Sequence, residues 1–420
     1  MPQDGRVVAR GAATAHLQAE LTPIVTVGST ATLTVRLVRT DAAASPGAPA
    51  PVDGDAGRIV AGGPVTVTVV PRGLRFLVGA RRSRLVRLPS ATAAEARFTM
   101  LAVDRGPAEV TVLVRGDGEL PLATVRLTSE VVGSDDHDQA GLARASARIA
   151  AADPLIVGRP TLRIDEEVAR GRSILHAALC VGGEAHRFRI RLADKARLVG
   201  EVRASLARAK EAGADLPAAE RADAVERGLR EVGARLAGQL LDRRARDLLW
   251  AHRDRLDGLV VQTTGETELP WELLVVRRPG AAASDADPFL GQFGLTRWLY
   301  DVAPPAAVRL STTTTDASAP RPATAIASAS VVALGSATGS AAGAAAAMRN
   351  GAGVVVECGG SGGRAALSET FLATFAAELA DGSPVDRASR RARAAAREAG
   401  EACAIAYAVY GHPDARALAA

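Results

Sequence analysis

The stretch LDGLVVQTTGETELPWELL, residues 256–274, decides the fold of the second half of the chain. It begins with a short apolar run that is typical of a buried strand. It then passes through a hydrophilic turn and ends in PWELL, residues 270–274. A Trp placed directly after Pro suits a helix start with an aromatic ring packed in the core, because Trp buries more area than any other side chain. We therefore expect Trp271 to be structural.

Apolar runs and helical segments alternate downstream of this stretch. Short apolar runs typical of strands occur at 308–310, 330–336, 352–358 and 404–410, and helical patterns at 340–350, 365–380 and 384–399. This alternation predicts an α/β fold with a mostly parallel sheet that is covered by helices on both faces.

The segment upstream of 256 predicts strands followed by helices. Three short strands are expected within 155–192. A single long amphipathic helix is expected over 219–250, because apolar residues recur at spacings of three and four: Val225, Leu229, Val232, Leu236 and Leu240. We assign these elements to the same domain, residues 155–420.

The N-terminal residues 1–130 have the period-two pattern of half-buried antiparallel strands. In ATLTVRLV (31–38), apolar and polar residues alternate, and similar runs separated by turn residues follow. Several such strands within one domain predict an all-β immunoglobulin-like sandwich. Residues 131–154 change composition abruptly and are expected to form a linker.

In their order, the C-terminal segments resemble the CHAT domain, a caspase-like cysteine-peptidase family. The match runs from the long helix and PWELL through PFLGQFGLTRWLYDVAPP (288–305). It ends in a series of residues typical of the family: Phe371, Phe375, Leu379, Gly382, Ser383, Pro384, Ala394, Ala395, Arg397, Tyr410, Gly411 and Pro413. The resemblance covers roughly the C-terminal half of the chain and implies a caspase-like α/β domain.

The residues that carry catalysis in the CHAT family are missing. The family needs a His at the end of one strand and a Cys at the end of the next, so that a thiolate can attack a carbonyl while the imidazole moves a proton. The segment between Tyr300 and Val331 has no His, and Ala337 occupies the position of the family Cys. No catalytic residue is therefore expected, and the resemblance implies a pseudo-protease.

Two alternatives stay open. Cys358 ends a predicted strand and opens the glycine-rich segment GGSGG (359–363), whose backbone amides suit an oxyanion, so Cys358 is the fallback nucleophile of an active cysteine endopeptidase. Alternatively, the N-terminal sandwich is a binding module and the C-terminal half supports it. The favoured hypothesis is a non-catalytic interaction or scaffold component of a bacterial multi-protein signalling or defence system, the context that the resemblance implies.

Composition excludes several classes of function. The formal net charge is +5, but the arginines are scattered and aromatics are only 3% of the chain, so no nucleic-acid partner is expected. No apolar run long enough for a membrane span or a signal peptide occurs, and the cysteines have no pairing or metal spacing. Asp135, Asp136, His137 and Asp138 are read as part of the solvated linker. We expect a cytoplasmic protein without cofactor or metal that binds a protein partner.

Overall fold

The chain forms two compact units in a computed structural model. The structure describes residues 15–39, 64–87, 93–115, 121–133, 143–148, 159–169, 172–212, 215–263, 268–281, 284, 286–299, 302, 307–315, 330–334, 341–349, 351–358 and 367–418. The first unit takes in Met1–Val157 and Val168–Arg170, and the second takes in Gly158–Glu167 and Gly171–Ala420. Each unit is described by itself.

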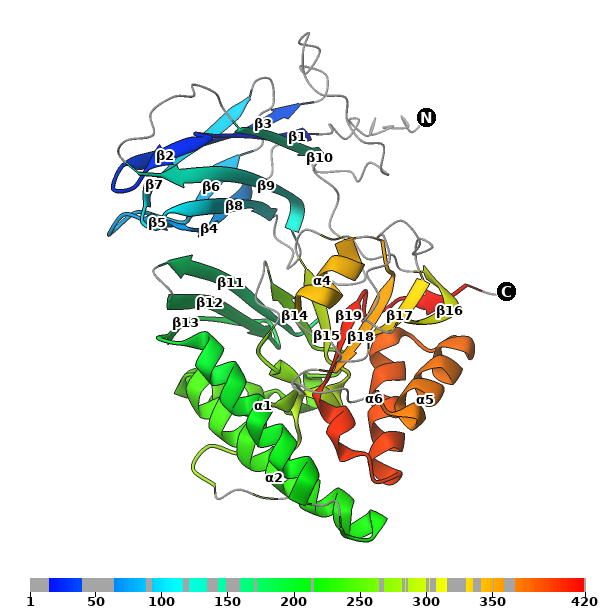
Figure 1. The fold of residues 1–420 in the computed structure, drawn as a ribbon. Helices are drawn as coiled ribbons and strands as arrows, with labels where there is room; N and C mark the ends of the chain where they lie inside the picture. The colour runs from blue at the N-terminus through cyan, green and yellow to red at the C-terminus, as the bar shows by residue number, and fades with distance from the viewer. Residues whose placement is uncertain are drawn as a thin grey trace, which may run out of the picture. The chain divides into compact units, whose positions relative to one another are not determined.

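The first unit contains two groups of hydrogen-bonded strands (Figure 1). One has the order β10-β1-β3-β7-β5 and is antiparallel throughout, with bounds β1 Ala15–Leu21, β3 Thr30–Arg39, β5 Leu74–Phe76, β7 Ala94–Ala102 and β10 Ala143–Arg148. The other has the order β2-β9-β8-β4 with β6 beside β4, and bounds β2 Ile24–Thr26, β4 Pro64–Arg72, β6 Ser83–Arg87, β8 Gly106–Arg115 and β9 Pro121–Val132.

The alternating pattern of 31–38 explains why these strands share one core. Leu33 and Val35 on β3 are buried together with Val67 on β4 and Val112 on β8, in one hydrophobic cluster drawn from both groups. Their polar neighbours in sequence point the other way, because successive side chains of a strand alternate between faces. The expected antiparallel β-structure of this region is therefore confirmed.

Part of the expected linker 131–154 is a strand. Residues of β10 pair antiparallel with β1, in a register that joins Leu21 to Ala143 and His16 to Arg148. The run ARASAR has small and charged side chains and no large apolar residue, so its hydrophobic pattern is too weak to reveal a strand.

The second unit is built on a mixed, largely parallel sheet. Its order is β11-β14-β15-β19-β18-β17-β16-β20, with β12 beside β11 and β13 beside β12. The bounds are β11 Thr161–Ala169, β12 Arg172–Val181, β13 Glu184–Leu192, β14 Val260–Thr263, β15 Thr296–Leu299, β16 Ala307–Thr315, β17 Ser330–Leu334, β18 Val354–Cys358, β19 Tyr407–Gly411 and β20 Arg416–Ala417. β18 and β19 pair antiparallel, whereas β14, β15 and β19 run parallel to one another.

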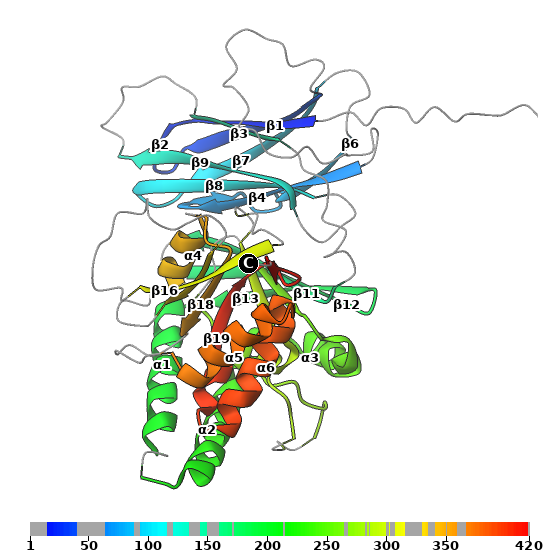
Figure 2. The same cartoon turned by 90° about the vertical axis from the view of Figure 1, so that its right-hand side faces the viewer.

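Helices cover this sheet on both faces. They are α1 Lys195–Ala212, α2 Ala218–Leu240, α3 Arg243–Ala251, α4 Ala341–Arg349, α5 Glu369–Ala380 and α6 Val385–Glu398. Val354 and Val356 pack with α5 and α6, whereas Val355 between them packs with α4, so the two groups of helices lie on opposite faces. Figure 2 shows α5 and α6 on the side of the sheet turned toward the viewer. The expected α/β composition of this region is confirmed.

The helix expected over 219–250 is two helices. Leu241 is extended at φ −118° and ψ 128°, which ends α2. Asp242 then caps α3, because its Oδ1 accepts a hydrogen bond from the Ala245 amide at 2.8 Å. The apolar spacing continues across the break, so only the capping Asp signals it.

PWELL is buried as expected. Trp271 is fully buried and begins a one-turn 3₁₀ helix, Trp271–Leu273. Within the part of the chain that the structure describes, no helix is both long enough and apolar enough to cross a membrane.

Candidate functional site

The residues singled out for peptidase chemistry are only partly described. Ala337, the glycine-rich segment 359–363 and the acidic group at 135–138 lie outside the described residues. For Cys358 the structure describes the backbone, which ends β18 opposite Tyr407 of β19. The position of Cys358 in the sheet is therefore fixed, and it can be compared with the positions of the histidines.

His412 lies at the other end of the strand pair from Cys358. β18 and β19 are antiparallel, so Cys358 is level with Tyr407 while His412 follows the far end of β19. Five residues of extended chain separate these two levels by about 16 Å. The His412 ring is buried against Trp298, with ring centroids 5.3 Å apart, and its Nδ1 accepts a hydrogen bond from the Asp414 amide at 3.1 Å.

The remaining described histidines of the second unit have partners of their own. His176 Nε2 lies 3.1 Å from Glu167 Oε2, and His186 Nε2 lies 3.0 Å from Asp242 Oδ2. His252 Nε2 lies 3.6 Å from Glu184 Oε1. His176 is on β12, and five strand-to-strand steps separate β12 from β18, or about 24 Å of sheet.

A buried ion pair joins PWELL to the sheet instead. Arg297 on β15 donates from Nε to Glu272 Oε1 at 2.7 Å and from Nη2 to Glu272 Oε2 at 2.5 Å. The same guanidinium donates to the Leu269 carbonyl at 2.8 Å and to the Tyr410 hydroxyl at 3.3 Å. Both charged side chains are almost completely buried, so this bidentate pair positions the 269–274 segment on the strands.

Glu357, the residue before Cys358, extends this network. Burial raises its pKa to about 7, although the Arg297 charge and a hydrogen bond with Tyr410 act in the opposite direction. On α6, burial lowers the pKa of the Arg393 guanidinium to about 10, a value at which it keeps its charge at neutral pH. Arg393 donates to the carbonyls of Gly291 and Tyr407, at 3.0 and 2.7 Å.

The sequence contains a signal for this network, although no peptidase motif includes it. Glu272 and Arg297 each interrupt an apolar run, WELLVV and LTRWL. A charged residue inside a buried run is rarely left unpaired, because an isolated buried charge is costly. Two such residues of opposite sign predict a pair, although the spacing of 25 residues in the chain gives no hint of its geometry.

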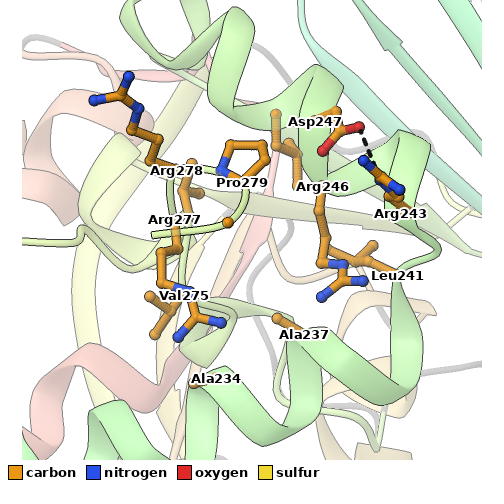
Figure 3. Close-up of a pocket in the computed structure, with 13 residues that line it drawn as sticks. Ala234, Ala237, Leu241, Arg243, Arg246, Asp247, Val275, Arg277, Arg278 and Pro279 are labelled. Atoms are coloured by element: carbon orange, nitrogen blue, oxygen red, sulfur yellow. Dashed lines mark ion pairs between the residues drawn. The ribbon is translucent and has the colours of Figure 1, made fainter. Parts of the chain in front are cut away.

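A second feature is a cavity of about 340 Å³ lined by arginines (Figure 3). We call it the arginine-lined cavity, and define it by the residues that line it: Ala234, Ala237, Leu241, Arg243, Arg246, Asp247, Leu249, Val275, Val276, Arg277, Arg278, Pro279 and Gly280. Four arginines and one aspartate give this lining a formal charge of +3.

The lining comes from three parts of the second unit. The end of α2 supplies a small apolar surface, α3 supplies Arg243 and Arg246, and the segment after PWELL supplies Arg277 and Arg278. In Figure 3 the guanidinium groups of Arg246 and Arg277 lie on either side of Ala237, whereas Arg278 points away from them at the rim. Arg243 pairs with Asp247, with Nε and Oδ2 3.9 Å apart.

The arginines of α6 differ from these, because the fold already uses them. Arg390 donates to Asp257 at 2.7 Å, Arg391 donates to Glu378 at 2.7 Å, and Arg397 pairs with Glu226. Arg393 is buried and donates to the Gly291 and Tyr407 carbonyls. Their role is to hold α6 in place.

The described residues do not form a metal site. No group of three or more His, Cys, Asp or Glu side chains there is arranged to hold a metal ion. The expectation that no metal or cofactor is used stays a prediction.

One family of known proteins is similar to part of the first unit. The family described as Domain of unknown function (DUF7363) matches residues 19–127, which run from β1 into β9. The match covers about a quarter of the chain and none of the second unit. No curated protein matches the chain.

Proposed function

We propose that this protein is a non-catalytic, CHAT-like pseudo-protease that works as an interaction or scaffold component of a bacterial multi-protein signalling or defence system. In this proposal the first unit is an immunoglobulin-like sandwich and the second is a degenerate caspase-like domain in the cytoplasm. Two groups of strands around one core, and a largely parallel sheet with helices on both faces, support this assignment of the units.

One observation carries the non-catalytic part of the proposal. Cys358 ends β18, whereas His412 follows the opposite end of the neighbouring strand and His176 lies five strands away. A thiol needs a base within hydrogen-bond reach to become an efficient nucleophile, and these separations are far larger than that reach. Cys358 has no activating imidazole among the described histidines of the second unit.

The carboxylate next to Cys358 does not replace the missing base. The Glu357 side chain is buried on β18. Glu357 is also engaged with Tyr410 and lies in the field of Arg297. Its raised pKa is therefore explained by burial in the network around Arg297, and it does not indicate a catalytic base.

The test is the rate of alkylation of Cys358 by iodoacetamide from about pH 5 to about pH 9, followed by peptide mapping. Cys403, which is half-buried, serves as an internal reference thiol, and Cys180, which is buried, reports unfolding. We expect Cys358 to react only as the pH approaches its ordinary pKa of about 8.5. Fast reaction below about pH 7, together with peptide cleavage that Cys358→Ala abolishes, would establish the cysteine-peptidase alternative instead.

A further inference from the structure

The arginine-lined cavity combines an apolar floor with a cationic rim. Ala234, Ala237, Leu241 and Leu249 belong to the helical side of the lining, and Val275 and Val276 face them from the segment after PWELL. Arg246 and Arg277 lie on either side of this floor, and Arg278 is exposed at its edge. Such a lining suits a ligand with one apolar group and several negative charges close to it.

Two of these arginines are not used by the fold. Within the described part of the chain, the guanidinium groups of Arg277 and Arg278 have no hydrogen-bonding or ion-pairing partner, in contrast to those of Arg390, Arg391 and Arg397. Arg246 lies near the charge of Asp242, the cap of its own helix, and shares the lining of the cavity with Asp247. Charge that the fold leaves unpaired is available to a ligand.

The floor of the cavity is held rigidly. The Val276 amide donates to the Pro288 carbonyl at 2.8 Å, and Leu274 accepts from the Leu290 amide at 2.8 Å. Val275 forms an isolated antiparallel bridge with Phe289. A preformed site lowers the entropic cost of binding, because little of the protein has to be ordered when the ligand arrives.

The chemistry of the lining favours a protein segment over a nucleic acid. Binding to single strands relies on aromatic side chains on which bases stack, and none of the lining residues is aromatic. The cavity is a pocket with an apolar floor, whereas a phosphate backbone is followed by an extended basic strip. Planar guanidinium groups bind carboxylates through two parallel hydrogen bonds, and this geometry suits Asp and Glu side chains.

We propose that the arginine-lined cavity is a docking site for an acidic segment of a partner protein, with an apolar side chain of the segment on the floor and its flanking carboxylates on Arg246, Arg277 and Arg278. This inference deepens the proposed scaffold function and rests on it only for the idea that the protein works by binding a partner. It names the surface and the chemistry of the segment that binds there.

The experiment is a fluorescence-anisotropy titration of the full chain against a short fluorescein-labelled peptide in which glutamates flank a central leucine. The matched peptide has glutamine in place of every glutamate. We expect a dissociation constant on the order of 10 µM for the acidic peptide, weakening with salt, and at least about tenfold weaker binding of the glutamine peptide.

Variants locate the site on the chain. Arg246→Ala combined with Arg277→Ala should weaken binding of the acidic peptide by about tenfold or more, because both guanidinium groups flank the floor. Arg244→Ala is the matched control, since Arg244 is exposed on α3 but does not line the cavity, and it should leave binding unchanged. Circular dichroism checks that each variant is folded.

Three outcomes overturn the inference: equal binding of the two peptides, equal loss in Arg244→Ala, or tighter Arg277-dependent binding of a single-stranded oligonucleotide than of the peptide. These failures leave the non-catalytic proposal untouched, because that proposal fails only if the chain turns over a substrate. Conversely, the chain could cleave the acidic peptide while binding of the peptide still depends on Arg277. That result would support the docking site and overturn the proposal that the protein is a pseudo-protease.

Discussion

Arg297 and Glu272 form a bidentate ion pair in the interior of the second unit, with side chains that are 3% and 0% exposed. The pair connects β15 to the 3₁₀ turn of PWELL, two segments that are 25 residues apart in the chain. Arg297 also reaches Tyr410 of β19, so a single side chain joins three elements. Because both charges are shielded from water, each side chain needs the other as its counter-charge.

Removing one member of this pair should be far more harmful than removing both. Arg297→Leu leaves Glu272 buried without a counter-charge, and we expect a loss of about 3–5 kcal/mol in the free energy of unfolding. In the double variant Arg297→Leu/Glu272→Leu no buried charge is left unpaired, so much of that loss should be recovered. Urea denaturation followed by tryptophan fluorescence measures this, because Trp250, Trp271 and Trp298 all belong to the second unit. A double variant that is as unstable as the single one would contradict this account.

The stability of the second unit should fall as the pH rises toward neutrality. Burial raises the pKa of Glu357 from 4.5 to about 7. The stabilisation that comes from its bound proton is therefore complete below about pH 4.5 and is lost as the pH rises through about 7. The same urea experiment at about pH 5 and about pH 8 should show a difference of up to about 3 kcal/mol from this group.

A neutral substitution isolates that contribution from other titrating groups. Glu357→Gln keeps the shape of the protonated carboxyl and cannot ionise, so its stability should change less between the two pH values than that of the native chain. Glu211→Gln, an exposed position on α1, should keep the native pH dependence. Identical pH profiles for Glu357→Gln and the native chain would show that Glu357 does not titrate in this range.

Arg159 connects the beginning of β11 to the C-terminal part of the sheet. Its guanidinium donates to Asp386 at 2.8 Å and pairs with Asp414. Arg159→Gln leaves two half-buried carboxylates close together, and we expect a loss of about 1–3 kcal/mol in the free energy of unfolding of the second unit. Arg197→Gln is the control, because Arg197 pairs with Glu201 on α1 of the same unit while largely exposed, so this substitution should leave the stability nearly unchanged. Equal effects of the two substitutions would mean that Arg159 is no more than a surface charge.

Elements with a strong local pattern could be predicted from the sequence, and those decided by distant contacts could not. The alternation in 31–38 and the apolar run before Cys358 correctly indicated β3 and β18. The break at Asp242 was missed, because Leu240 and Leu241 continue the helical spacing across it. β10 was missed because its side chains are small or charged, and its pairing with β1 spans more than a hundred residues.

The candidate site was harder to predict than the fold. The arginine-lined cavity exists only because α2, α3 and the segment after PWELL come together, and no local pattern marks Arg246 and Arg277 as neighbours. Arg390, Arg391 and Arg397 of α6 lie much closer together in the chain than Arg246 and Arg277. In the structure those arginines pair with Asp257, Glu378 and Glu226. Spacing along one helix shows which residues share a face, and it does not show whether the fold already neutralises that face.

Gly233 on α2 should be essential for the close packing of the PWELL segment against that helix. A Cβ at this position would lie 2.0 Å from the Leu273 carbonyl oxygen and 2.9 Å from Val275 Cγ2, so α2 and the segment after Trp271 have to separate in Gly233→Ala. Gly→Ala at an exposed position within a helix normally stabilises it by up to about 1 kcal/mol. Here we expect the opposite sign, a loss of about 1–3 kcal/mol, because the clash is with backbone.

Gly238→Ala supplies the matched control for this prediction. Gly238 lies on the same helix, and an added Cβ there meets no atom within 4 Å, so this substitution should stabilise the unit by up to about 1 kcal/mol. The two variants also test the cavity, because Val275 lines it. Binding of the acidic peptide should weaken in Gly233→Ala and stay unchanged in Gly238→Ala. If both variants are stabilised alike, the close approach of α2 to Leu273 does not exist in solution, and the rigid floor that we infer for the arginine-lined cavity has to be abandoned with it.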